Sequence, residues 1–217
     1  MPAPSVPEAS PAASAEQPTA SVEATPEVVA VVLRPERLDL VDAARAELEQ
    51  LSYDLDAAVL VAELTTVFGT APAIEESPAD CCEVPRTTIY RWPGFEVWDD
   101  HMGRFDDADP TVWIDEDVPD DRDMNVVIIV TAPAVGAIPV TTSAGFAIGD
   151  DPSGLAGAIS DFEGLPFAGI PMETGAELGP PEIEGSSNAY SVVLQAYEGA
   201  AGFPRLIAPL NVGVPSV

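Results

Sequence analysis

The sequence predicts an α+β fold, in which a mostly antiparallel sheet carries one main helix at about 54–68 and a short helix at about 152–160. Short apolar runs that alternate or are rich in β-branched residues recur between Gly and Pro turns, as in antiparallel strands. Only one long segment has the start and stop signals of a helix. With 217 residues, 47% of them hydrophobic, the chain is large enough for one domain with a core, which we place at 28–217.

The first ordered segments are expected to be strands beginning near Val28. Residues 28–33 are strand-like, and residues 37–41 and 47–53 alternate polar and apolar side chains. We predict a hairpin that turns near 43–46. A helix over 38–51 fits the same pattern and is kept as the alternative.

The main helix has signals at both ends. Asp54 is a candidate N-cap, Gly69 suits the left-handed position after the last turn, and Pro72 prevents continuation. The apolar positions expected to face the core are Leu55, Val59, Leu60, Leu64, Val67 and Phe68.

The rest of the chain is predicted to be mainly strands. Residues 87–92 and 95–98 form a hairpin around Pro93-Gly94, and the apolar run 125–131 is a central strand. Asp151-Pro152 opens the short helix. The other expected elements are a strand at 111–114, a hairpin of 138–142 with 145–148, a loop over 164–185, and closing strands at 189–197 and 205–210.

Two segments have similar sequences. Gly94 to Asp100 and Gly145 to Asp151 both place an aromatic residue after a glycine and end on two acids. This likeness suggests a duplication with halves around 94 and 145, although a glycine turn followed by a core strand is also a general hairpin pattern.

Residues 1–27 are expected to be a disordered stalk. They consist almost entirely of Pro, Ala, Ser, Glu and Thr, with too little apolar surface to offset the entropy lost on ordering. Such a spacer suggests that an export signal or a lipid-anchored segment once preceded it, and hence a secreted or cell-envelope protein, with a cytoplasmic location as the alternative. No apolar run reaches the roughly 18 residues of a membrane-spanning helix.

The charge of the chain is strongly negative. It has 37 acids and eight basic residues, all arginine, for a net charge of −29. This field repels nucleic acids and anionic membrane surfaces, so it leaves cations or cationic proteins as partners. The absence of lysine excludes Schiff-base chemistry, a P-loop lysine and a Ser-Lys dyad.

The segment 96–123 holds twelve acids and suggests Ca²⁺, which prefers oxygen ligands. The EF-hand pattern fails, because registers that start at Asp107 or Asp115 lack the glycine and the final glutamate. We therefore consider an irregular calcium site and, as the alternative, a solvated acidic loop without a cofactor. The candidate ligands are Asp106, Asp107, Asp109, Asp115 and Asp117.

Cys81-Cys82 are the only cysteines. Adjacent cysteines can remain thiols in a structural role, close a strained vicinal disulfide that takes part in binding, or pair between chains. A zinc site of Cys₄ or Cys₂His₂ type lacks the required ligands.

His101 is the only histidine, so a nucleophilic hydrolase of the Ser-His or Cys-His type would have to use the Asp99–His101 region. No nucleophile-elbow motif accompanies it. A surface histidine in an acidic loop explains the same residues, and catalysis is not the favoured interpretation.

A set of short strings between Leu33 and Gly213 carries a resemblance. They are Leu33-Arg34-Pro35, Leu64, Phe68-Gly69, Thr88 to Trp92, Gly94-Phe95, Met124-Asn125-Val126, Thr142, Gly145-Phe146, Gly149-Asp150 and Asn188-Ala189-Tyr190. These strings resemble those of uncharacterised exported proteins and lipoproteins of high-GC Gram-positive bacteria, which implies an envelope location with no known activity. A helix that ends in Phe-Gly before Tyr-x-Trp strands is also similar to the helix-on-sheet modules of small envelope lipoproteins and β-lactamase inhibitor proteins, which bind other proteins.

From these observations we expect a non-catalytic binding or structural protein, secreted or associated with the cell envelope. Its partner is unknown and is expected to be another envelope protein. The alternatives are a calcium-binding module that uses 96–123 and a hydrolase that uses the region of His101.

Overall fold

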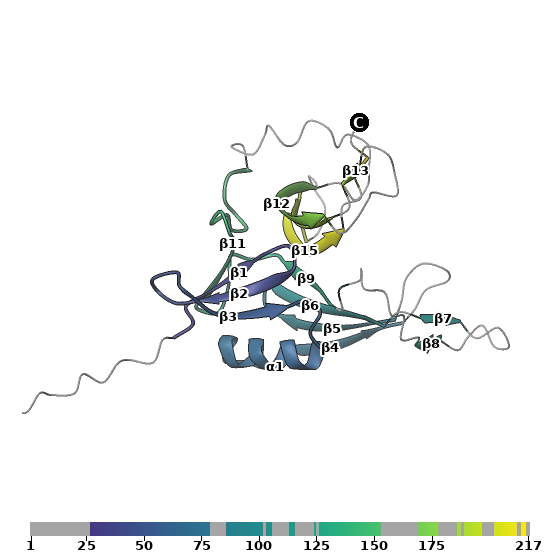
Figure 1. Ribbon diagram of the computed structural model, residues 1–217. Coiled ribbons are helices and arrows are strands. Elements are labelled where there is room, and N and C mark those ends of the chain that lie inside the picture. The colour runs from purple at the N-terminus through teal and green to yellow at the C-terminus, as the bar shows by residue number, and fades with distance from the viewer. Residues whose placement is uncertain are drawn as a thin grey trace, which may run out of the picture.

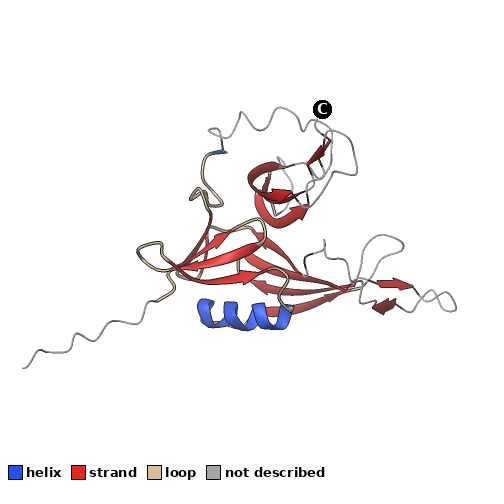
Figure 2. Ribbon diagram, in the orientation of Figure 1, coloured by secondary structure: helices blue, strands red, loops and turns tan. Residues whose placement is uncertain are grey.

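The computed structural model is an α+β fold dominated by antiparallel strands, which confirms the predicted class (Figure 2). It describes residues 27–78, 86–101, 103–105, 113–115, 124, 126–152, 169–177, 186–187, 189–196, 202–211 and 214–215. Within these ranges one helix is present, α1 (Ala57–Phe68).

The strands form two main sheets. One sheet has the order β10-β11-β1-β2-β3, and the other has the order β12-β14-β15-β9-β6-β5-β4. Among the described pairs, β1 and β11 are parallel and the others antiparallel. The strand bounds are β1 Ala30–Leu33, β2 Arg37–Val41, β3 Glu47–Ser52, β4 Ala73–Ser77, β5 Arg86–Trp92, β6 Phe95–His101, β7 Gly103–Phe105, β8 Trp113–Asp115, β9 Val126–Val130, β10 Ala134–Val135, β11 Ile138–Thr142, β12 Ile170–Glu177, β13 Ser186–Ser187, β14 Ala189–Gln195, β15 Arg205–Asn211 and β16 Val214–Pro215.

Both sheets and α1 contribute to one hydrophobic core. Leu33 and Leu38 come from the five-stranded sheet, Phe95 and Ile128 from the seven-stranded sheet, and Leu64 from the helix. Figure 1 shows α1 along one side of the layered strands, with β12 and β15 curving back toward β1. The described parts of the two sheets therefore share one core. The single domain over 28–217 stays a prediction.

The predicted hairpin of 37–41 and 47–53 is confirmed, and the alternative helix over 38–51 is wrong. The side chain of Asp42 favours the hairpin, because its Oδ1 accepts hydrogen bonds from the backbone N–H groups of Ala44 and Ala46 at 2.8 Å each. These bonds stabilise a turn, in which Arg45 has a φ of 62°.

The helix α1 begins two residues later than the predicted cap. The Oδ1 of Asp56 accepts from the N–H of Ala58, whereas Asp54 lies in a turn in which the N–H of Leu55 bonds to the carbonyl of Ser52. Gly69 ends the helix with a φ of 69°, as expected. Of the predicted core positions, Leu60, Leu64 and Phe68 are buried, but Val59 is half exposed.

The predicted 87–92 and 95–98 hairpin is confirmed as β5 and β6, with Gly94 at a φ of 81°. Phe68 packs edge-on against Trp92 and Phe95, at ring centroid distances of 5.4 and 5.3 Å. This aromatic cluster fixes the end of α1 on the sheet. The predicted central strand is β9, which lies in the middle of the seven-stranded order.

Three predictions for the strands are wrong. Residues 145–148 form no strand, because β10 and β1 already occupy both edges of β11. The segment 73–77, for which no strand was predicted, is β4, and 170–177, within the predicted loop, is β12 despite Pro171 and Gly175.

The lack of a strand at 145–148 also bears on the proposed duplication. Gly94–Asp100 enters β6, whereas Gly145–Asp151 contains no strand, so the two segments differ in structure. The short helix at 152–160 falls outside the described residues except for Pro152, and most of the 1–27 stalk does too.

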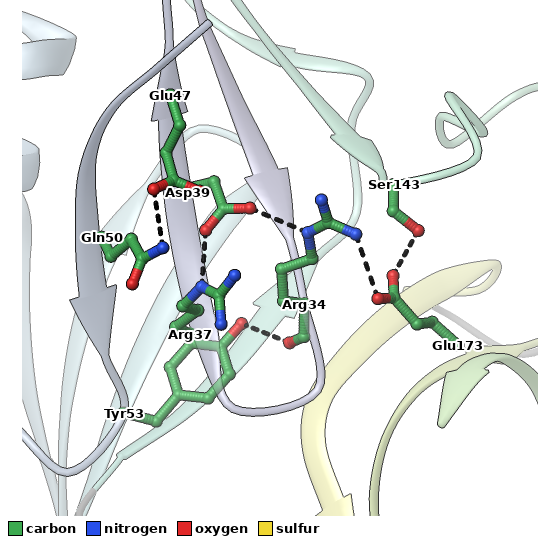
Figure 3. Close-up of polar contacts among 8 residues, drawn as sticks. All are labelled: Arg34, Arg37, Asp39, Glu47, Gln50, Tyr53, Ser143 and Glu173. Atoms are coloured by element: carbon green, nitrogen blue, oxygen red, sulfur yellow. Dashed lines mark hydrogen bonds and ion pairs between the residues drawn. The ribbon is translucent and has the colours of Figure 1, made fainter. Parts of the chain in front are cut away.

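A polar junction holds the two sheets together at the turn between β1 and β2 (Figure 3). Asp39 is buried, and its two oxygens accept from Nε of Arg34 at 2.8 Å and from Nε of Arg37 at 2.7 Å. Nη1 of Arg34 also reaches Glu173 of β12 at 3.1 Å, and the hydroxyl of Ser143 donates to the same carboxylate. The pKa of the Arg34 guanidinium is raised, chiefly by the hydrogen bond to Asp39.

Tyr53 completes this junction from the core. Its hydroxyl donates to the carbonyl of Arg34 at 3.1 Å, and its N–H donates to the carbonyl of Glu36 at 3.1 Å. Its own carbonyl accepts from the N–H of Val126, the first residue of β9, at 3.2 Å. Tyr53 therefore joins the β1–β2 turn to the seven-stranded sheet. Burial raises the pKa of its phenol well above the ordinary value, so the hydroxyl stays a donor.

We expect Asp39→Asn to lower the free energy of unfolding by about 2–4 kcal/mol, because it leaves two arginines beside a neutral, buried side chain. Urea denaturation of the full chain measures the loss. Glu47→Gln, a change of the same kind at an exposed residue of β3, is expected to cost less than about 0.5 kcal/mol. Equal losses in the two variants would contradict the importance of the junction.

Candidate functional site

A second group of polar side chains, apart from the Asp39 junction, surrounds His101. We call it the His101 cluster and define it as Asp56, Glu76, Thr88, Asp99 and His101. It is built from the N-cap of α1 and from three neighbouring strands, β4, β5 and β6.

Strand register brings the members together. Glu76 lies opposite Thr88, and Thr88 lies opposite Asp99, so the three form a row across the sheet. His101 follows Asp99 by two residues and therefore lies on the same face. Tyr90 and Val97 lie opposite each other on the same face, one pair nearer the turn at Gly94. Closer still to that turn, Phe68 of α1 packs on Trp92 and Phe95.

The hydroxyl of Thr88 is the centre of the hydrogen bonds. Its Oγ1 lies 2.8 Å from Nε2 of His101, and it also reaches the two carboxylate oxygens of Glu76 at 3.2 and 3.3 Å. Oδ2 of Asp99 lies 3.9 Å from the same Nε2. A protonated His101 would thus pair with Asp99.

The carboxylates of the cluster repel one another. Burial raises the pKa of Asp99, and the charges of Asp56, Asp100 and Glu76 raise it further, against the opposing effect of His101. Burial likewise raises the pKa of Tyr90, with the nearby Asp99, Glu76 and Asp56 adding to the effect. A charged Asp99 is therefore costly in the free protein.

Three arginines form ion pairs with carboxylates outside the His101 cluster. Arg91 bridges Glu75 at 2.6 Å and Glu96 at 2.7 Å on the opposite face of the sheet, while Arg34 and Arg37 belong to the Asp39 junction. Arg86 lies across from His101 in the β5–β6 pairing. Asp100 lies on the opposite face, where its Oδ1 accepts a hydrogen bond from the hydroxyl of Thr87 at 2.7 Å. The cluster itself therefore holds three carboxylates beside one histidine.

The hydrolase prediction can be compared with this geometry. Thr88 has a potential base, His101, within hydrogen-bond distance. Thr88 is only 7% exposed, however, so a substrate cannot readily reach its hydroxyl. Asp99 approaches the same ring nitrogen as Thr88, whereas the orienting acid of a triad binds the opposite nitrogen. The described arrangement therefore lacks the geometry of a triad.

The predicted calcium and cysteine sites lie largely elsewhere. Cys81, Cys82, Asp106, Asp107, Asp109 and Asp117 fall outside the described residues, and Asp115 is placed as the last residue of β8, paired with Gly103. Among the described residues, no group of three or more His, Cys, Asp or Glu side chains is arranged to hold a metal ion. The calcium site and the vicinal disulfide stay predictions.

Comparison with known proteins gives no relative: no family model, curated protein or solved structure matches this chain. Within the described residues, α1 is too short to cross a membrane.

Sequence reasoning found part of the cluster. It singled out Asp99 and His101, but it missed Glu76, Thr88 and Asp56. Thr88 and Asp99 could have been paired by extending the predicted hairpin outward from Gly94. Glu76 could not, because β4 itself was not predicted.

We expect Asp99→Asn to raise the stability of the folded chain near pH 7. The pKa of Asp99 is higher in the folded than in the unfolded chain, so the charged form costs free energy above the folded pKa. This cost disappears as the pH falls below the unfolded value of about 4. The gain at pH 7 is expected to be below about 1 kcal/mol, since the site is partly solvated.

Urea denaturation between pH 4 and pH 8 tests this expectation. The advantage of the variant should shrink as the medium becomes more acidic. Glu49→Gln, on the exposed strand β3, serves as the charge-matched control. A variant that is less stable than the wild type at pH 7, or an advantage that does not change with pH, would contradict the account.

Proposed function

We propose that this is a non-catalytic binding protein, secreted or associated with the cell envelope, which recognises a cationic partner protein at the β4–β6 end of its seven-stranded sheet. The observation that carries the proposal is the row across the sheet that places Glu76, Thr88 and Asp99 side by side. Burial raises the pKa of Asp99 there, and the charges of Asp56, Asp100 and Glu76 raise it further. Cationic groups of a partner would relieve this repulsion on binding.

The chemistry of the cluster favours binding over catalysis. Thr88 is buried, and Asp99 is not positioned as the orienting acid of a triad. Glu76, in contrast, is exposed on β4 and available to a partner. A carboxylate surface of this kind accelerates encounter with basic proteins and disfavours acidic ones.

The net charge of the whole chain also favours a cationic partner. Its net charge of −29, with no lysine, attracts cations over long range. The proposal of an envelope or extracellular location is supported by the composition of residues 1–27 and by the resemblance to exported proteins.

A charge-matched comparison tests the site. The double variant Glu76→Gln and Asp99→Asn is compared with the double variant Glu47→Gln and Glu49→Gln, which removes the same number of charges from β3. The probe is a fluorescent hexa-arginine peptide, and its binding to the full chain is followed by anisotropy at low and physiological ionic strength.

We expect the first variant to lose about fivefold in affinity, since two ion pairs at a partly solvated site contribute about 0.5 kcal/mol each. The control is expected to lose less than threefold, through the weaker overall field. Equal losses would show that only net charge matters and would overturn the proposed site.

A further inference from the structure

We infer that the outer edge of β4 binds an extended basic-apolar segment of the partner protein, which adds to the seven-stranded sheet as an eighth strand. This inference rests on the proposed function and specifies how the partner docks. The sheet ends at β4, which pairs with β5 and with no other described strand (Figure 1). Edge strands of this kind are templates for strand addition.

The edge of β4 is regular enough to accept a strand. All five of its residues, from Ala73 to Ser77, pair with β5 in an unbroken antiparallel register. The opposite edge of the same sheet is different, because β12 contains Pro171 and two register shifts against β14. Proline and bulges are common protection against strand addition, and β4 contains neither.

The side chains of β4 are accessible. Four of its five residues are exposed, and Ile74, with 64% of its surface exposed, is the most exposed large apolar residue among those described. Ile74 lies opposite Tyr90, and Glu76 lies opposite Thr88, so both belong to the face of the His101 cluster. A strand paired with β4 would cover Ile74 and come next to Glu76.

These positions specify the chemistry of the partner segment. Side chains two residues apart share a face of a strand, so an apolar residue beside Ile74 places the residue two positions away beside Glu76. A lysine or arginine there would meet the carboxylate of Glu76, with Asp99 and Asp56 behind it. On the other face Glu75 is already paired with Arg91, at 2.6 Å, and requires no further cation.

Charge disfavours a second copy of this chain as the occupant. Antiparallel self-pairing over the whole of β4 would place Glu75 opposite Glu75 and each Ile74 opposite Glu76. Like charges directly opposite each other destabilise a strand pair, and the apolar side chain would gain no apolar neighbour. A basic-apolar segment of a different protein fits the edge better.

The probe for this inference is the blocked peptide Thr-Val-Thr-Arg-Thr-Val-Thr. Its valines and arginine share one face, in a pattern that reads the same in parallel and antiparallel pairing. The control peptide has the same sequence but is N-methylated at its three central residues, which removes backbone donors on both edges and keeps the charge. Binding to the full chain is measured by NMR titration of the backbone amides.

We expect the largest shifts at the amides of β4, and at least a tenfold weaker affinity for the methylated peptide. Ile74→Arg should weaken binding by tenfold or more, whereas Val59→Arg, at a half-exposed residue of α1, should change it less than threefold. The two variants add the same charge, so the comparison isolates the edge.

Equal binding of the two peptides would overturn strand addition while leaving the cationic site in place. No binding of the alternating peptide to a chain that does bind hexa-arginine through the His101 cluster would overturn it as well. If the cluster variant and its charge-matched control lost the same affinity for hexa-arginine, the proposed function itself would be overturned.

Discussion

The guanidinium of Arg34 is the group on which the rest of the structure depends. It hydrogen-bonds to buried Asp39 in its own sheet and to Glu173 on β12, a strand of the other sheet. The carbonyl of the same residue accepts the hydroxyl of Tyr53, whose own carbonyl holds the first residue of β9. A chain rich in acids and poor in cations thus places arginines where one cation satisfies two carboxylates. Arg34 and Arg37 are paired with Asp39 and Glu173, so neither of them pairs with the carboxylates of the His101 cluster.

Much of the fold could be predicted from local patterns. The β5–β6 hairpin follows from Pro93-Gly94 between aromatic strands, and the end of α1 follows from Gly69. The failures share a cause: β4 and β12 carry exposed or proline-containing sequences that become strands because an existing sheet edge offers hydrogen-bond partners. Residues 145–148 had the pattern of a strand but no free edge to pair with. Long-range strand pairing therefore outweighed local propensity, both where it created strands at β4 and β12 and where it left 145–148 without one.

The candidate site was partly visible in the sequence for the same reason. Asp99 and His101 attracted notice as a rare histidine among acids, but their relation to Thr88 depends on register, and their relation to Glu76 depends on a strand with no signature of its own. Asp56 enters through the cap of α1, two residues from the expected position. The cluster is a product of four elements, and no spacing along the chain encodes it. Its exposed neighbour Ile74 then connects the acidic surface to an open sheet edge.

The most direct test of this account is a double-mutant cycle on Arg34 and Glu173 in the full chain. Arg34→Gln, Glu173→Gln and the double variant are compared with the wild type by urea denaturation, and the coupling free energy is taken from the four values. The account predicts a coupling of about 1 kcal/mol, because the ion pair is partly shielded and joins the two sheets. Additive losses, with a coupling below about 0.3 kcal/mol, would contradict the claim that Arg34 ties the sheets together.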